Sequence, residues 1–168
     1  MSNNNQSYIP LFDENEMKMV EHHISKYPQK MAAIMPVLWM IQNKYGWISL
    51  EAMKYAGDLL NLPADHVLGV ATFYTMYFKK PMGKFHLQVC TNVSCMLRGG
   101  YEVFDHICSK LEIKNKEITS DKMFSIEEVE CLGSCGTAPM LQVNNKEYYE
   151  NLSLNKVDEL LTQLRNSK

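Results

Sequence analysis

The sequence predicts a mixed α/β (α+β) protein in two parts, a helical N-terminal part and a sheet-bearing C-terminal part. Apolar residues recur every three or four positions through residues 11–80, which is typical of packed helices. From residue 85 onward, short apolar runs alternate with helical patterns, as in a small sheet covered by helices. We therefore expect a helical domain over residues 11–80 and an α/β domain over residues 85–168, which carries two close pairs of cysteines.

Composition and charge exclude several classes of protein. The 168 residues carry a formal net charge of -2, without the basic patch that nucleic-acid or anionic-membrane binding needs. Residues 1–10 are polar and Asn-rich and lack the features of a secretory signal, so we expect a disordered tail. Residues 31–42 and 67–78 are the longest uncharged apolar stretches, and both fall short of the roughly 20 residues that span a bilayer. We expect a cytoplasmic chain without direct membrane insertion.

Two helices are predicted first. Asp13 and Glu16 have the spacing of a capping box, which predicts a helix over residues 13–26. Pro28 suits the start of a second helix and Gly46 its end. Pro36 lies inside the second pattern and should break or kink this helix near Ile34.

Two further helices complete the N-terminal part. Ser49 is placed to cap a third helix that runs to Leu60, and Pro63 to open a fourth that runs toward Phe78. Gly69 weakens the fourth pattern, so two shorter helices are an alternative. We expect the apolar stripes of these helices to belong to the core; a groove that binds a partner is the alternative. They comprise Val70, Phe73, Tyr74 and Tyr77, and Met31, Met35 and Met40.

The C-terminal part is predicted to alternate strands and helices. Gly99-Gly100 leads into a helix, and a second helix covers residues 154–164. Asn144-Asn145 suits a two-residue hairpin turn, since Asn tolerates positive φ. Strands are expected at residues 85–90, 124–130, 140–143 and 146–149.

Four cysteines are candidate metal ligands: Cys90, Cys95, Cys131 and Cys135. They form one C-x4-C and one C-x3-C pair, each after an apolar run and beside loop-forming residues. Neither pair is the C-x-x-C of a dithiol redox motif. Such spacings favour an iron-sulfur cluster and leave a zinc site open.

Other reactive residues are not assigned to the site. Cys108 shares a helix face with Phe104 and Leu111, which indicates core. The five histidines do not assemble into a site by spacing, and no dinucleotide loop, phosphate loop or catalytic triad is present. We expect no catalytic residue in this chain alone. Arg98 is a candidate positive charge near the cluster, and we expect Arg98→Ala to lower its reduction potential.

The residues around the cysteines resemble a known family. Residues 89–95 (VCTNVSC) and 129–139 (VECLGSCGTAP), with Gly46-Trp47-Ile48, residues 70–74 (VATFY) and residues 81–84 (PMGK), are similar to the small thioredoxin-fold 2Fe-2S subunits (the E subunits) of bacterial NADH:quinone oxidoreductase, respiratory complex I. The resemblance runs from about residue 27 to the C-terminus. It departs at Asp121-Lys122-Met123, where a Gly commonly follows the Asp.

The resemblance implies both a cofactor and partners. It implies a thioredoxin-like ferredoxin domain with one 2Fe-2S cluster on Cys90, Cys95, Cys131 and Cys135, and a cis peptide at Pro139. It also implies a flavoprotein partner (the F subunit) that holds FMN and NADH, other peripheral-arm subunits, and a place on the cytoplasmic side of the inner membrane. Three alternatives stay open: the equivalent subunit of an NAD-linked hydrogenase or formate dehydrogenase, a free-standing ferredoxin, and a zinc-stabilised interaction module.

Overall fold

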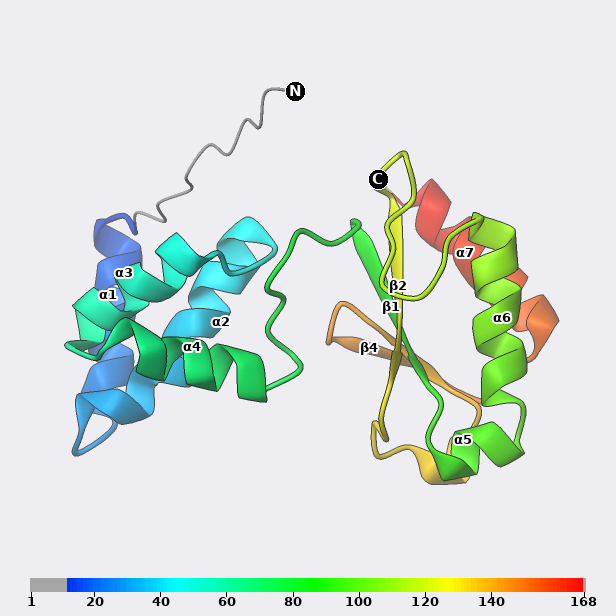
Figure 1. The fold of residues 1–168 in the computed structure, drawn as a ribbon, viewed down its shortest axis with the longest axis horizontal. Helices are drawn as coiled ribbons and strands as arrows, with labels where there is room; N and C mark the ends of the chain where they lie inside the picture. Colours follow the sequence, from blue (N-terminus) through cyan, green and yellow to red (C-terminus); the bar gives the residue numbers. More distant parts are fainter. Residues whose placement is uncertain (1–11, 168) are drawn as a thin grey trace. The chain divides into compact units, whose positions relative to one another are not determined.

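A computed structural model describes residues 12–167 (Figure 1). The described chain forms two compact units, one ending at Pro81 and the other beginning at Met82. The disordered tail expected at residues 1–10 lies outside the described residues. No helix in the described part of the chain is long and apolar enough to cross a membrane.

The N-terminal unit is entirely helical over the residues described. Its elements are α1 (Glu14–Ser25), a 3-10 helix η1 (Lys30–Ala33), α2 (Ile34–Tyr45), α3 (Leu50–Leu60) and α4 (Ala64–Phe73). Their buried apolar side chains, among them Val37, Leu38, Ile41, Ile48 and Ala56, form one core.

Local sequence chemistry sets the ends of three of these helices. Asp13 caps α1 in the predicted capping box with Glu16, and the Ser49 hydroxyl accepts from the Ala52 N–H at the start of α3. Gly46 ends α2 with a φ of 81°. Pro36 is the third residue of α2, where its missing N–H falls among amides that have no intrahelical partner. The predicted break near Ile34 is confirmed, because a separate 3-10 helix precedes that residue.

The fourth helix is shorter than predicted. It ends at Phe73, and Tyr74 is already extended with a ψ of 115°. Residues further along bond to α2 instead of continuing the helix: the Phe78 N–H donates to Gln42 Oε1 (2.6 Å), and Gln42 Nε2 donates to the Met76 carbonyl (2.8 Å). Phe73, Tyr74 and Met31 are 77%, 39% and 45% exposed, so the prediction that they belong to the core is wrong.

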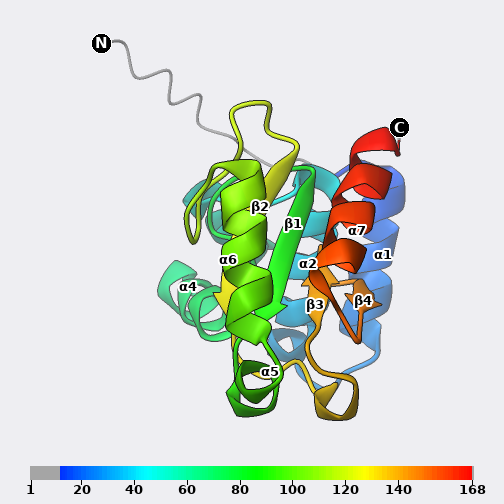
Figure 2. The same cartoon turned by 90° about the vertical axis from the view of Figure 1, so that its right-hand side faces the viewer.

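The C-terminal unit is a four-stranded mixed sheet with two long helices on one face (Figure 2). Its strands are β1 (Phe85–Cys90), β2 (Phe124–Val129), β3 (Leu141–Val143) and β4 (Glu147–Tyr149), in the order β2-β1-β3-β4. Its helices are α5 (Val93–Leu97), α6 (Gly100–Leu111) and α7 (Leu154–Asn166), and a 3-10 helix η2 covers Cys135–Thr137. The sequence predicted the strands and α6 and α7 within a few residues and missed α5.

Alternation along β1 separates an apolar from a polar face. Leu87 and Val89 pack with side chains of α6 and α7 such as Ile107 and Val157. His86 and Gln88 belong to the opposite face, because successive strand residues point to opposite sides. The mixed α/β fold class that the sequence predicts is confirmed.

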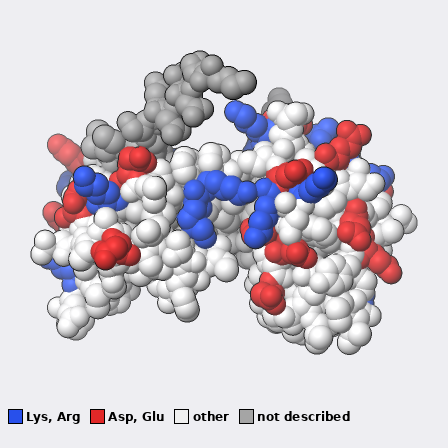
Figure 3. All heavy atoms as spheres, viewed as in Figure 1, with Lys and Arg blue, Asp and Glu red and all other residues white. Residues whose placement is uncertain are grey.

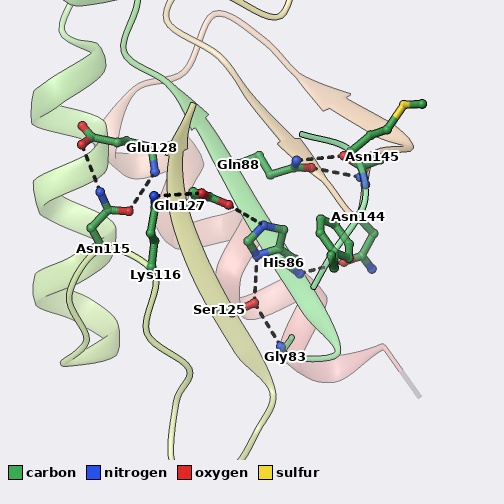
Figure 4. Close-up of polar contacts among 12 residues, drawn as sticks. Gly83, His86, Gln88, Asn115, Lys116, Ser125, Glu127, Glu128, Asn144 and Asn145 are labelled. Carbon is green, nitrogen blue, oxygen red and sulfur yellow. Dashed lines mark hydrogen bonds and ion pairs between the residues drawn. The ribbon is translucent and has the colours of Figure 1, made fainter. Parts of the chain in front are cut away.

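The polar face of the sheet is held by side-chain hydrogen bonds (Figure 4). His86 Nδ1 lies 2.9 Å from Ser125 Oγ on β2. Gln88 Nε2 donates to Asn145 Oδ1 (2.8 Å), and the Asn145 N–H donates to Gln88 Oε1 (3.1 Å). Asn144 and Asn145 both have positive φ, at 54° and 57°, as predicted for the hairpin turn. These bonds fix the neighbours of β1, the strand that ends in Cys90.

Candidate metal centre

The four predicted ligand cysteines lie on two loops that leave the sheet at one edge. Cys90 is the last residue of β1, and Cys131 comes two residues after the end of β2. Because β1 and β2 are parallel, their carboxyl ends lie side by side. We call residues 90–95 the first cysteine loop and residues 131–137 the second cysteine loop.

Side chains connect the two loops. Asn92 Nδ2 donates to Glu130 Oε2 across a distance of 2.9 Å. The pKa of the Cys135 thiol is raised, chiefly by its hydrogen bond with Cys131, and a hydrogen bond with Ser94 of the first loop opposes this shift. The structure therefore brings the two pairs to one place.

The two cysteines of the first cysteine loop are buried. Cys90 and Cys95 are each 2% exposed and pack with Ala138 and Met140. The short helix α5 carries Cys95 back toward the end of β1. Burial, followed by a hydrogen bond with Cys90, raises the pKa of the Cys95 thiol to about 11, while a backbone hydrogen bond with Met140 opposes this shift. A positive metal centre would offset the cost of ionising such a buried thiol.

The second cysteine loop is exposed. The sulfurs of Cys131 and Cys135, both exposed, are 3.4 Å apart. The Gly133 N–H donates to Cys131 Sγ at 3.4 Å. Gly133 has a φ of 85°, in the left-handed region that glycine adopts without strain.

Bonds from the end of β4 hold the second cysteine loop in place. The Tyr148 hydroxyl donates to the Leu132 carbonyl at 2.8 Å. The Glu150 carboxylate accepts from the hydroxyls of Ser134 and Thr137, the latter at 2.6 Å. The Ala138–Pro139 peptide that follows is cis, as the resemblance implied. The sequence patterns gave no indication of Tyr148 or Glu150, because these contacts join residues 13 to 16 positions apart in different elements.

The donor set fits an iron-sulfur cluster. All four candidate ligands are thiols, and soft thiolates bind iron-sulfur clusters and zinc. Within residues 12–167, no three or more His, Cys, Asp or Glu side chains are already arranged as a metal-holding group. The structure thus shows two close pairs rather than a finished four-ligand arrangement, and the assignment of the ligands remains a proposal.

The remaining candidates lie outside the site. Cys108 packs against the core of the C-terminal unit, as predicted. Arg98 is exposed and caps the end of α5, and its effect on the cluster stays a prediction. Among the histidines, His106 pairs with Asp158 at 2.8 Å and His86 with Ser125. Neither contact involves a cysteine.

Residues 20–165 match the family described as thioredoxin-like [2Fe-2S] ferredoxin. The chain belongs to this family. Its cofactor is accordingly a 2Fe-2S cluster, which agrees with the all-thiol donor set. The thioredoxin-like fold predicted from the resemblance is thereby confirmed.

Two named relatives cover nearly the whole of this ferredoxin. It is 42% identical over 158 residues to the E subunit of NADH-quinone oxidoreductase from Rickettsia bellii, covering 92% of this chain and 94% of the relative. It is 41% identical over 159 residues to NADH-quinone oxidoreductase subunit 2 of Thermus thermophilus, covering 94% and 88%. The chain therefore belongs with the small subunits of this oxidoreductase.

A solved structure shares the fold of this ferredoxin. One polypeptide of the NAD+-reducing [NiFe]-hydrogenase in the H2-reduced state superposes with a TM-score of 0.67 and 18% identity. The match covers 79% of this chain and 22% of the hydrogenase polypeptide.

Proposed function

We propose that this chain is the electron-transfer subunit of the NADH dehydrogenase module of respiratory complex I. One observation carries the proposal: two cysteine pairs meet at the carboxyl ends of β1 and β2 in a chain 42% identical to an E subunit of NADH-quinone oxidoreductase. Cys90, Cys95, Cys131 and Cys135 are the proposed ligands of the 2Fe-2S cluster. When bound, the cluster supplies one-electron chemistry, with a formal charge of about -2 when oxidised and one unit more negative when reduced.

The residues of this chain hold that cluster and set its surroundings. The first cysteine loop supplies two thiols from a buried, water-poor position. The second supplies two exposed thiols and a backbone N–H that already donates to sulfur. Hydrogen bonds to sulfur stabilise negative charge there and favour the reduced cluster.

We further propose a flavoprotein partner that holds FMN and NADH. An exposed apolar surface beside the first cysteine loop supports docking there; it consists of Val93, Met96, Leu97 and Tyr101. The surface around α5 carries few charged side chains on the face in Figure 3, and Leu97 is 78% exposed. Apolar patches rimmed by polar residues mark protein interaction sites.

The wider assembly follows from the same proposal. Other peripheral-arm subunits would complete the complex, and the chain would lie on the cytoplasmic side of the inner membrane, attached through its partners. The helical part (residues 11–80) and the α/β part (residues 85–168) would be separate domains.

An equivalent subunit of an NAD-linked hydrogenase is the second candidate. The shared fold with the hydrogenase polypeptide favours it. A formate dehydrogenase module is supported only by the family resemblance, and a zinc-stabilised module only by the spacing of the cysteines.

Purification of the tagged chain with its natural partners tests the proposal. We expect an FMN-containing protein to co-purify and NADH to produce the EPR signal of a reduced binuclear cluster. Hydrogen-driven NAD+ reduction by the same sample would favour the hydrogenase alternative. If NADH does not reduce the cluster in this preparation, the electron-transfer role is contradicted.

A further inference from the structure

Glu150 is the group on which the side-chain bonds of the second cysteine loop converge. Its Oε1 atom accepts from both Ser134 and Thr137, the residues one before and two after Cys135. The two hydroxyl oxygens also lie 2.7 Å from each other, and the Thr137 hydroxyl lies 3.1 Å from the Ser134 carbonyl. A single carboxylate oxygen thus joins the two ends of the turn that presents Cys135.

The backbone on both sides of Glu150 is held by hydrogen bonds. It directly follows β4, which pairs with β3 through Leu141 and Tyr149. The neighbouring Asn151 N–H donates to the Thr137 carbonyl at 2.7 Å. Hydrogen bonds from the two hydroxyls hold the pKa of Glu150 below its usual range, so the side chain is ionised at neutral pH. The sheet therefore positions the exposed second cysteine loop through the carboxylate of Glu150.

We propose that Glu150 is the positioning residue of the second cysteine loop, fixing Cys135 for the cluster through the Ser134 and Thr137 hydroxyls. The proposal rests on the proposed function, since it presumes that Cys135 binds the cluster. Glu150 also engages the Ser134 hydroxyl, which would otherwise be free to donate to nearby sulfur. Its negative charge opposes the extra electron of the reduced cluster. Glu150 thus keeps the loop ordered and holds the reduction potential low.

The test compares full-length Glu150→Ala and Glu150→Gln with the wild type. Two properties are measured: the midpoint potential, by redox titration of the EPR signal, and the rate of iron loss to a chelator. We expect E150A to lose iron at least about tenfold faster, because it removes two hydrogen bonds to a charged group and the loss of one such bond is typically worth about that factor. Both variants should raise the midpoint potential, because each removes a negative charge. E150Q keeps an acceptor oxygen and should lose iron more slowly than E150A.

Glu147→Gln is the matched control. Glu147 lies on β4, three residues before Glu150, and accepts from Tyr149, so E147Q removes an equal charge without touching the loop. It should leave both properties near the wild-type values. In the double variant S134A/T137V, adding E150A should not accelerate iron loss further, because the partners of Glu150 are already gone.

The outcomes separate this inference from the proposed function. Wild-type values for both properties in E150A and E150Q would overturn the inference and leave the cluster assignment standing. The inference is also overturned if E147Q raises the potential as much as E150Q. If E150A does not fold, the midpoint potential and iron loss of E150Q and of S134A/T137V decide whether the inference holds. A wild-type chain without iron would overturn the proposed function and this inference together.

Discussion

The two cysteine loops reach the same place by different physical means. The first cysteine loop has two buried cysteines and is shaped by a strand end, a short helix and close backbone packing. The second is exposed and is held by hydrogen bonds to Tyr148 and Glu150. Packing around its two cysteines supports the first loop, whereas individual polar bonds support the second. One half of the site therefore depends on packing, and the other half depends on a few polar bonds.

Replacing cysteines has the largest expected effect. The two loops should differ in how much such a replacement changes the free energy of unfolding. Cys95→Ser and Cys135→Ser should each lose the cluster, because one of four thiolate ligands is gone. Only Cys95→Ser should also lower the free energy of unfolding of the apo chain, by about 1–3 kcal/mol, since it places a hydroxyl in a buried apolar position. Iron counts and urea unfolding give the two readouts. Cys108→Ser is the control and should keep its iron.

Alanine at two glycines tests backbone packing in the two loops. A Cβ on Gly100 would lie 2.9 Å from the carbonyl oxygens of Cys90 and Cys95, whereas a Cβ on Gly136 meets nothing within 4 Å. Gly100→Ala should therefore destabilise the chain by about 1–3 kcal/mol, as overpacking does, and accelerate iron loss. Gly136→Ala should be close to neutral in the same unfolding and chelation measurements. Equal effects would show that the first loop is no more tightly packed than the second.

Tyr148→Phe tests the other anchor of the second cysteine loop. The change removes one hydrogen bond, from the Tyr148 hydroxyl to the Leu132 carbonyl. We expect a loss of about 0.5–1.5 kcal/mol and faster amide exchange within residues 131–137, with exchange in the first loop unchanged. If amide exchange becomes equally faster in both loops, the two loops are not supported by separate contacts, which would contradict this account.

The smallest expected effect lies outside both loops, in the ion pair that joins α6 to α7. His106 Nε2 lies 2.8 Å from Asp158 Oδ1, and this bond is the main cause of the lowered pKa of Asp158, ahead of the contact with Lys110. Because the folded pKa lies below the ordinary value of 3.8, the carboxylate stabilises the fold above that pH. This contribution is lost as the pH falls through the folded pKa.

Asp158→Asn checks this contribution. The difference in urea midpoint between wild type and variant should be small at pH 7, because the pair is partly exposed, and should vanish in acid. A difference that persists unchanged to pH 2 would assign the effect to something other than ionisation.

The sequence predicted the elements whose ends depend on local chemistry. Asp13, Ser49 and Gly46 define helix ends through their own side chain or backbone, and Asn144-Asn145 define a turn in the same way. The four candidate ligand cysteines were proposed from spacing and loop context, and their assignment stays a prediction. Each of these signals lies within a few residues of the feature that it specifies.

The sequence did not predict features that are too short to form a pattern or that depend on residues distant in the chain. Helix α5 has only five residues and no side-chain cap, so its pattern is too short to recognise. The apolar pattern of α4 continues through Tyr74 and Tyr77, although the following backbone bonds to Gln42 instead. The role of Glu150 depends on residues 13 and 16 positions away, and no local pattern marks such a contact.

The most direct test of the central claim is a spectrum of the anaerobically purified chain with its metals counted on the same sample. Four thiolates from the two loops should hold one binuclear cluster, so we expect a brown protein with about two irons per chain and a binuclear EPR signal on reduction. A colourless protein with stoichiometric zinc would contradict the claim, because zinc has no redox chemistry.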